Sequence, residues 1–403
     1  MEVVFLKLLN LSITAGWLVL AVALLRLILK KSPKWVFCLL WGLAGIRLVL
    51  PFSLESVFSL IPSAKTVPET ITYAQTPVID SGVGIVDQAV NPVIAESLVP
   101  TAGTSVNPAQ VITHAASMIW IVGMIAMLLY LIVSYLRLRN RVRTATLLEG
   151  NIRQSETVAA PFILGLFKPG IYLPYHLNKS DFEHVVAHEN AHLKRRDHLI
   201  KPMAFLILTV YWFNPLMWLA YILLCRDIEL ACDEKVIRTM NEDQRKSYST
   251  TLLNCHVNRH VMASCPLAFG EGGVKERVIH VKAYKKPAFW IIAVAIIACI
   301  VIAVCFLTNP VELTFDFGSN SIIAASSHDM REDSPDPYLR DFTEAQIDEL
   351  ASRLEGITGA RLSDRYGGLT PFYAISAELA DGTWIRICGY RSEGDMTDII
   401  YND

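Results

Sequence analysis

The chain has 403 residues, of which 53% are hydrophobic and only 18% are charged, and its mean hydropathy is +0.38. These values exclude an ordinary soluble domain and indicate a membrane protein. The formal net charge of −2 leaves no basic excess, so direct binding to nucleic acid is not expected. Four apolar stretches are candidates for transmembrane helices of ~20 residues, namely Val3–Leu29, Trp35–Phe52, Ile112–Leu136 and Ala288–Leu307.

The basic residues that flank these stretches predict the orientation of the chain. Three lysines at 30–34 lie between the first two stretches, four arginines at 137–143 follow the third, and three lysines at 282–286 precede the fourth. Because basic flanks remain on the cytoplasmic side of a bacterial membrane, we expect both termini outside and residues 137–287 inside.

The segment between the second and third stretches, residues 53–111, has a different composition. From Ile61 to Pro108 it is rich in Pro, Ser, Thr, Ala, Val and Gly, carries little charge and shows no clear hydrophobic period. We therefore expect an extended or partly disordered extracytoplasmic loop.

Residues His188-Glu189-Asn190-Ala191-His192 spell H-E-x-x-H in a stretch that is compatible with a helix. Histidines four residues apart lie on one helix face, one turn apart, so both imidazoles can reach one metal ion. The adjacent Glu189 can touch a water on that ion without being a ligand itself. Two nitrogen ligands and a general base are the minimum equipment of a zinc peptidase. An amphipathic surface helix that carries the pentapeptide by chance is the alternative.

A tetrahedral catalytic zinc needs a third protein ligand and one open position. Glu229 and Asp233 lie four apart in residues 226–234, which contain good helix formers and no breaker. We predict that a second helix offers Glu229 as the third ligand and that Asp233 holds a ligating histidine through its other ring nitrogen. A solvated acidic face is the alternative. Asp197 and His198 are either further supporting groups or simply the polar end of the first helix.

The stretch Leu199–Cys225 is also strongly apolar, but a crossing there would leave His192 and Glu229 on opposite sides of the membrane. Asn214-Pro215 divides the stretch into two legs, each too short to cross ~30 Å of hydrocarbon. We therefore predict a helical hairpin, residues 199–225, that is buried against the spans or dips into the membrane.

The last segment, residues 308–403, carries 7 arginines, no lysine and 18 acidic residues. Residues 343–346 (Thr-Glu-Ala-Gln) have the pattern of a capping box that opens a helix. Two runs of alternating polarity, 373–380 and 383–390, flank the dipeptide 381–382 (Asp-Gly), which is typical of a two-residue hairpin. We predict a small folded α+β module outside the cell, with an extracytoplasmic ligand that the sequence does not identify.

The first 310 residues resemble the membrane metallopeptidase module of the bacterial β-lactam-resistance sensor-transducers, the antirepressors of BlaR/MecR type. The resemblance rests on four separated motifs in the same order. These are Ala160-Pro161-Phe162 through Gly165 with Lys168-Pro169 and Ile171-Tyr172-Leu173-Pro174, then His188 to His198, then Phe213-Asn214-Pro215, and finally Glu229-Leu230-Ala231-Cys232-Asp233.

This resemblance implies a gluzincin-type zinc site with the three ligands and the base named above. It also implies a cytoplasmic protease domain, driven by an external sensor, that cleaves itself, a transcriptional repressor, or both. A self-cleavage site would fall within roughly residues 255–287. In this picture Ile171, Tyr172 and Leu173 form the edge strand on which an extended substrate pairs.

The tail departs from the well-known members of that family. Those members carry a penicillin-binding sensor with S-x-x-K and K-T-G motifs after the last span. The tail here contains no lysine and is too short for that fold, so no β-lactam acylation is expected.

The predicted fold is an α-helical membrane protein with four transmembrane helices, an inserted cytoplasmic α+β zinc peptidase domain of gluzincin type, and a small extracytoplasmic α+β tail. The predicted boundaries are 1–52 for the first two spans, 53–111 for the loop, 112–136 for the third span, 137–287 for the peptidase domain, 288–307 for the fourth span and 308–403 for the acidic module.

The predicted function is that of a zinc metalloendopeptidase in the bacterial cell membrane, which converts an external signal into cleavage of itself or of a cytoplasmic repressor or other protein. A housekeeping protease that clears damaged membrane proteins is one alternative. A receptor or scaffold without catalysis is another, although the intact Glu189 argues against it. The group that stabilises the oxyanion is left open among Tyr248, His256, His280 and the zinc ion itself. The oligomeric state, a dimer included, is also open.

Overall fold

The structure of the protein is a computed structural model. Contacts divide it into two compact units, one of residues 1–54 and 58–309 and the other of residues 55–57 and 310–403. The residues that the structure describes are 1–50, 54–72, 77–98, 107–175, 177–257, 273–310, 313–314, 322–329, 338–348, 358–359, 373–379, 384–392 and 395–402.

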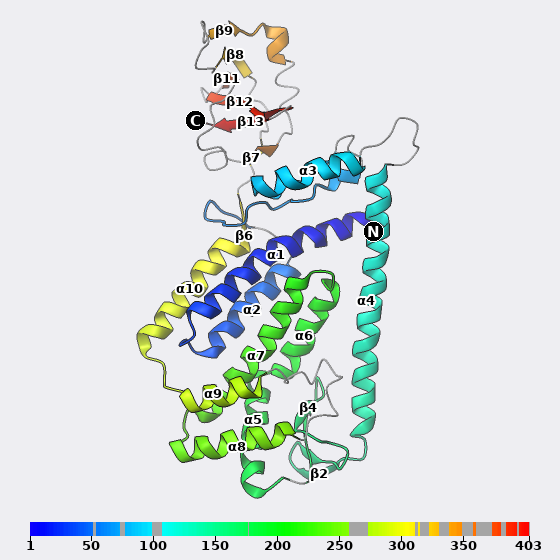
Figure 1. Ribbon diagram of the computed structural model, residues 1–403, viewed down its shortest axis with the longest axis vertical. Coiled ribbons are helices and arrows are strands. Elements are labelled where there is room, and N and C mark those ends of the chain that lie inside the picture. The colour runs from blue at the N-terminus through cyan, green and yellow to red at the C-terminus, as the bar shows by residue number, and fades with distance from the viewer. Residues whose placement is uncertain are drawn as a thin grey trace. The chain divides into compact units, whose positions relative to one another are not determined.

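The first unit is mainly helical (Figure 1). Three of its helices, α1, α4 and α10, are long and apolar enough to cross a membrane. The helices of this unit are α1 (Glu2–Ile28), α2 (Lys34–Val49), η1 (Glu69–Thr72), α3 (Gly84–Leu98), α4 (Pro108–Arg141), α5 (Lys179–Arg195), α6 (Asp197–Val210), α7 (Pro215–Ile237), α8 (Glu242–Val257), α9 (Val274–Ala283) and α10 (Phe289–Leu307).

Helix α2 is shorter than the predicted second span. It has 16 residues, which cover about 24 Å at 1.5 Å per residue, less than the ~30 Å of a bilayer core. The helix ends at Val49 because Leu50 is extended, with ψ 115°, as is usual for a residue that precedes a proline. The structure thus supports three of the four predicted spans, and a crossing by α2 stays a prediction.

Helices α6 and α7 form the predicted hairpin, and they pack against α1 and α2 (Figure 1). Asn214 caps α7 by accepting a hydrogen bond from the Leu216 amide, and Pro215 takes the first helical position, which needs no amide donor. Helix α7 continues beyond Cys225 to Ile237. The second hairpin leg and the helix that carries Glu229 are therefore one helix, which extends past the predicted hairpin end at residue 225.

The prediction of an irregular loop at 53–111 is wrong for part of that segment, because the structure contains α3 and the short helix η1 there. Apolar residues recur along α3 at helical intervals, but Gly84 and Pro92 obscure this period in the sequence. The Asn91 side chain bonds the backbone of Ile79 in both directions, at 2.9 and 3.1 Å, and so holds the preceding chain on the helix.

A four-stranded sheet lies between α4 and α5 in the chain, with the strand order β2-β3-β5-β4. The prediction that residues 171–173 form an edge strand is wrong, because β5 lies between β3 and β4. The reason is pairing, because both backbone edges of β5 are bonded to neighbouring strands. Both faces of β5 are also covered: Ile171 packs toward Val185 of α5, and Tyr172 stacks on Phe162 at 5.5 Å between ring centroids. The strands are β2 (Thr146–Glu149), β3 (Ile152–Gln154), β4 (Phe162–Leu164) and β5 (Gly170–Leu173).

The second unit contains an antiparallel sheet with the strand order β13-β12-β11-β8-β9. The two predicted hairpin strands are present and paired, with Glu378 opposite Trp384, while the dipeptide 381–382 lies outside the described residues. Residues 344–348 are helical, and the Gln346 side chain accepts from the Thr343 amide at 3.1 Å, as in a capping box. The strands are β8 (Ile322–Asp329), β9 (Tyr338–Asp341), β11 (Tyr373–Leu379), β12 (Trp384–Ser392) and β13 (Asp395–Asn402), with the short strands β1 (Leu54–Glu55), β6 (Thr308–Asn309), β7 (Leu313–Thr314) and β10 (Thr358–Gly359) elsewhere in the chain.

Candidate metal centre

Helix α5 carries the H-E-x-x-H residues, and it ends in a sharp turn. Arg196 adopts the left-handed conformation, with φ 61°, and its amide bonds back to the His192 carbonyl. Such a residue ends one helix and redirects the chain at once. Helix α6 therefore begins at Asp197, and its first carboxylate lies close to the end of α5.

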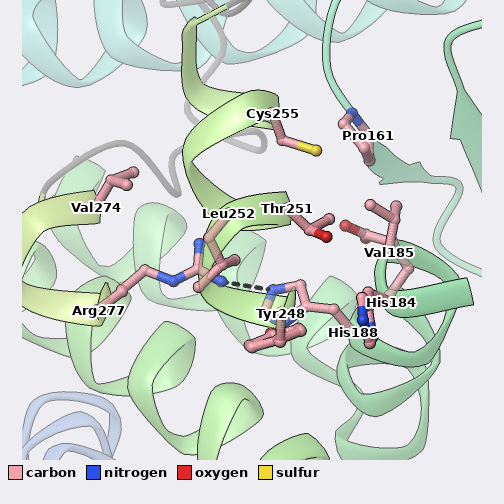
Figure 2. Close-up of a pocket in the computed structure, with 11 residues that line it drawn as sticks. Pro161, His184, Val185, His188, Tyr248, Thr251, Leu252, Cys255, Val274 and Arg277 are labelled. Carbon is pink, nitrogen blue, oxygen red and sulfur yellow. Dashed lines mark hydrogen bonds between the residues drawn. The ribbon is translucent and has the colours of Figure 1, made fainter. Parts of the chain in front are cut away.

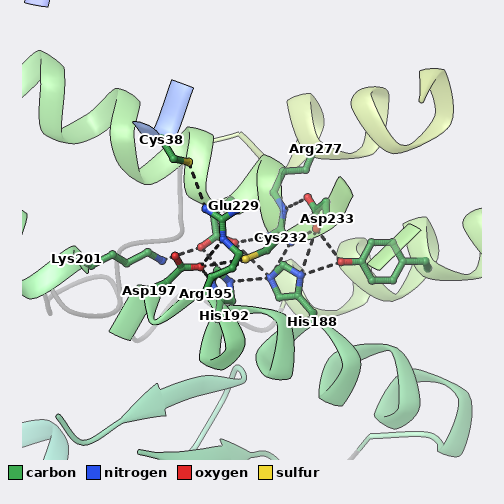
Figure 3. Close-up of polar contacts among 11 residues, drawn as sticks. Cys38, His188, His192, Arg195, Asp197, Lys201, Glu229, Cys232, Asp233 and Arg277 are labelled. Carbon is green, nitrogen blue, oxygen red and sulfur yellow. Dashed lines mark hydrogen bonds and ion pairs between the residues drawn. The ribbon is translucent and has the colours of Figure 1, made fainter. Parts of the chain in front are cut away.

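Three buried side chains, His188, His192 and Glu229, each place one atom that can bind a metal ion around a common point (Figure 3). These metal-binding atoms are called the donors below. His188 Nε2 lies 3.1 Å from His192 Nε2 and 3.4 Å from Glu229 Oε2, and His192 Nε2 lies 3.6 Å from Glu229 Oε1. Ligands about 2.0 Å from a tetrahedral zinc ion are about 3.3 Å apart. The donors of this set thus have the chemistry, the burial and the mutual spacing that a zinc ion requires.

The other ring nitrogen of His188 faces a hydroxyl and a carboxylate. Tyr248 Oη lies 2.9 Å from His188 Nδ1 and donates to Asp233 Oδ1 at 2.7 Å. Since the single hydroxyl proton goes to Asp233, the phenol oxygen can only accept from Nδ1–H. The lone pair of Nε2 then faces the other donors. Tyr248, a candidate for the oxyanion group, lies on the opposite side of the imidazole from that lone pair.

Asp197, whose role the sequence left open, is the partner of His192. Its Oδ2 lies 2.8 Å from His192 Nδ1, and the Cys232 thiol lies 3.1 Å from both atoms. Burial alone would raise the pKa of Asp197, but the hydrogen bond and the charge of His192 lower it below its ordinary value. A carboxylate that stays ionised here fixes the orientation of the imidazole ring.

Two cations that sequence reasoning missed lie against the acidic groups. Lys201 Nζ lies 2.8 Å from Glu229 Oε1, and Arg277 contacts both Glu229 at 3.2 Å and Asp233 at 2.7 Å. Burial would raise the pKa of Glu229, but the charges of Lys201, His192 and Arg277 lower it well below its ordinary value. No local pattern could have revealed these pairs, because Lys201 is 28 residues from Glu229 and Arg277 is 44 residues from Asp233.

A small pocket lies beside the donors, between α5, α8 and α9 (Figure 2). Glu189 lines this pocket and is only 7% exposed. Among the residues that the structure describes, none donates a hydrogen bond to its carboxylate. Pro161, which immediately precedes β4, lines the same pocket. A carboxylate in this position, beside the donor set, can accept a proton from a group that enters the pocket.

The two remaining oxyanion candidates do not contribute a described group to the pocket. His280 lies 3.0 Å from Glu234 Oε1 and does not line the pocket. The side chain of His256 lies outside the described residues. Arg277, which contacts His188, lines the pocket together with apolar side chains that include Leu252 and Val274.

Comparison with known proteins shows the family to which the chain belongs. A family model described as BlaR1 peptidase M56 matches residues 6–281, which include every residue of the centre. The chain belongs to this family. It is 26% identical over 202 residues to the methicillin resistance MecR1 protein of Staphylococcus aureus, and this match covers 43% of the chain and 34% of the relative. It is 30% identical over 105 residues to the regulatory protein BlaR1 of Bacillus licheniformis, covering 25% of this chain and 18% of the relative.

Membership in the M56 peptidase family, together with three apolar helices long enough to span a bilayer, identifies a membrane protein of a signal-transducing peptidase family. The chain spans about a third or less of the length of the curated relatives it matches.

Proposed function

We propose that the protein is a membrane zinc metalloendopeptidase of gluzincin type. His188, His192 and Glu229 would hold the ion, and Glu189 is the general base. The observation that carries this proposal is the buried donor set, with separations of 3.1 to 3.6 Å, beside a pocket that Glu189 also lines.

The residues of the centre divide the chemistry between them. A bound zinc ion supplies Lewis acidity, lowering the pKa of a water toward ~7 and polarising the scissile carbonyl. Glu189 accepts the proton of the attacking water and passes it to the leaving amine. Tyr248, which donates to Asp233, holds the His188 imidazole at its Nδ1 atom. Asp197 holds the His192 imidazole in the same way.

We infer that the substrate is an extended polypeptide that enters along β4. This strand is an edge of the sheet, and Pro161, which precedes it, lines the pocket. A polypeptide that adds to a sheet edge is bound through its backbone, while pockets select its side chains. A cytoplasmic repressor and a segment of this chain itself are both substrates of that kind, and the names of the relatives favour a regulatory target.

The proposed topology follows the charges that flank the helices. We propose that α2 is the fourth membrane crossing, alongside α1, α4 and α10, and that the lipid bilayer surrounds these helices. The basic flanks then place the centre, within residues 137–287, on the cytoplasmic side and residues 308–403 outside. In this arrangement an external signal reaches the peptidase through the spans.

Metal analysis tests the proposed function. In detergent-purified protein, wild type and Glu189→Gln are expected to hold about one zinc ion each, while Glu229→Gln loses most of it because an amide is a poor zinc ligand. Glu234→Gln is the matched control, since Glu234 lies on the same helix and bonds His280 rather than the donors. Fragments on a gel are expected from wild type and the control only. Zinc-free wild type, or full zinc in Glu229→Gln, contradicts the proposal.

Replacement of Tyr248 by Phe tests the support of His188. The change removes the hydroxyl that accepts from His188 Nδ1 and donates to Asp233, and it leaves Asp233 Oδ1, 3.3 Å from Nδ1, as the remaining partner. We therefore expect zinc affinity, measured by competition with a chelator, to fall about 10-fold, the lower end of the range for a lost supporting hydrogen bond. Tyr284→Phe is the control, because Tyr284 packs in the same apolar cluster as Tyr248 and does not touch the donors. Equal affinities in the two variants would show that the hydroxyl does not position the imidazole.

A further inference from the structure

We infer that Arg277 is a positioning residue of the metal centre, which fixes Glu229 and Asp233 relative to His188. The inference rests on the proposed zinc site and deepens it, because it assigns a function to a buried cation that the proposed chemistry does not use.

Arg277 lies on α9 and reaches α7 and α5 at once (Figures 2 and 3). Its Nε and Nη2 each lie 2.7 Å from an oxygen of Asp233, so the pair is bidentate. Its Nη1 lies 3.2 Å from Glu229 Oε2, and its Nη2 lies 3.2 Å from His188 Nε2. Arg277 is 5% exposed, and all of these partners are buried.

The chemistry of the guanidinium explains why an arginine occupies this position. A planar fork with fixed donors can hold one carboxylate with two nitrogens and still reach a second carboxylate with the third. A lysine offers one compact charge and cannot reproduce this pattern. The two carboxylates, Asp233 and Glu229, also neutralise a cation that would otherwise be strongly unfavourable in the interior.

Arg277 contacts the His188 imidazole on a different side from the group that supports it. Asp197 and Tyr248 face the Nδ1 atoms of the two imidazoles, whereas Arg277 faces His188 Nε2, the atom on the donor side. Its distances of 3.2 Å to His188 Nε2 and to Glu229 Oε2 are hydrogen-bond distances to two of the three metal-binding side chains. The guanidinium thus borders the donor set itself.

Arg245 provides a contrast within the same region. It lies on α8, donates to the Tyr284 carbonyl at 3.2 Å and stacks over the Tyr284 ring. It therefore joins α8 to the end of α9 without contacting any donor. A purely structural role for Arg277, as a link between α9 and α7, predicts that both arginines behave alike when they are replaced.

The test uses full-length protein in detergent, with wild type, Arg277→Gln, Arg277→Lys and the control Arg245→Gln. Zinc affinity is measured by competition with a chelator, and the donor geometry by the visible absorption of the cobalt(II)-loaded protein, which depends on ligand arrangement. We expect Arg277→Gln to bind zinc about 10- to 100-fold more weakly, with an altered cobalt spectrum. Arg277→Lys should lie between Gln and wild type, and Arg245→Gln should match wild type in both measurements.

Thermal unfolding in the same detergent identifies variants that do not fold. Arg277→Lys keeps the buried charge, so it decides the question alone if the Gln variant fails to fold. Wild-type affinity and spectrum in the folded Arg277 variants, or equal losses in Arg245→Gln, overturn the inference while the zinc site stands. A wild-type protein without metal overturns the proposed function, and the inference falls with it.

Discussion

Replacing Glu189 by Gln is expected to reduce peptide-bond cleavage about 10²- to 10⁴-fold, the usual contribution of a positioned general base, and to leave metal binding unchanged. The carboxylate lines the pocket beside His188, and among the described residues none donates a hydrogen bond to it. Gln has the same shape but cannot accept a proton from water. The measurement is self-fragmentation together with hydrolysis of fluorescently labelled casein, at equal zinc content.

Glu183→Gln is the matched control for Glu189→Gln. Glu183 is a carboxylate on the same helix, but it is exposed and does not line the pocket. The control is expected to retain wild-type cleavage. Full activity in Glu189→Gln would exclude Glu189 as the base, and loss of zinc in that variant would instead make the carboxylate part of the metal site.

Replacing Asp227 by Ala is expected to lower the free energy of unfolding by about 3 to 5 kcal/mol, the range for a buried ion pair that loses one partner. Asp227 is fully buried and accepts from Arg26 at 2.9 Å and from the Trp41 indole at 2.9 Å. It thereby joins α7 to α1 and α2. Glu276 lies 3.6 Å from Arg26 and remains as a partner, so we expect a loss near the lower end of the range.

The double variant Arg26→Met/Asp227→Leu distinguishes charge pairing from packing at this position. Removal of both partners leaves no unpaired charge, so the double variant should recover most of the lost stability. Unfolding is followed by denaturant titration in detergent. Glu242→Ala, which breaks an exposed pair with Lys246, is the control and should change stability little. A double variant no more stable than Asp227→Ala would show that the lost charge pair is not the cause.

Features that depend on neighbouring residues in the chain could be read from the sequence. The four-residue spacing of His188 and His192 places both imidazoles on one face of a helix, and the structure has their Nε2 atoms 3.1 Å apart. The hairpin at Asn214-Pro215, the strands around residues 381–382 and the helix start at Thr343 are local in the same way. Their signals are backbone preferences and hydrophobic periods that span a few residues.

The sequence also supplied a chemical argument for Glu229, since two histidines and a base leave a zinc ion without its third ligand. The structure brings its carboxylate within 3.4 and 3.6 Å of the two imidazoles. What the sequence could not reveal is that α7 runs unbroken from the hairpin to this carboxylate. The change from apolar to polar residues after Cys225 ends neither the helix nor its burial, because Asp227, Glu229 and Asp233 are buried within α7.

Other features were decided by contacts between distant segments. Whether β5 is an edge strand depends on which strands pair with it, and the position of β4 beyond it makes it an inner strand. Lys201, Tyr248 and Arg277 surround the centre only because α6, α8 and α9 pack against α5 and α7. By itself the sequence determined the helix that carries H-E-x-x-H, the apolar stretches and the chemistry that this motif allows. The tertiary structure decided which charges neutralise the buried carboxylates, because a buried ion pair is specified by proximity in space and leaves no period along the chain.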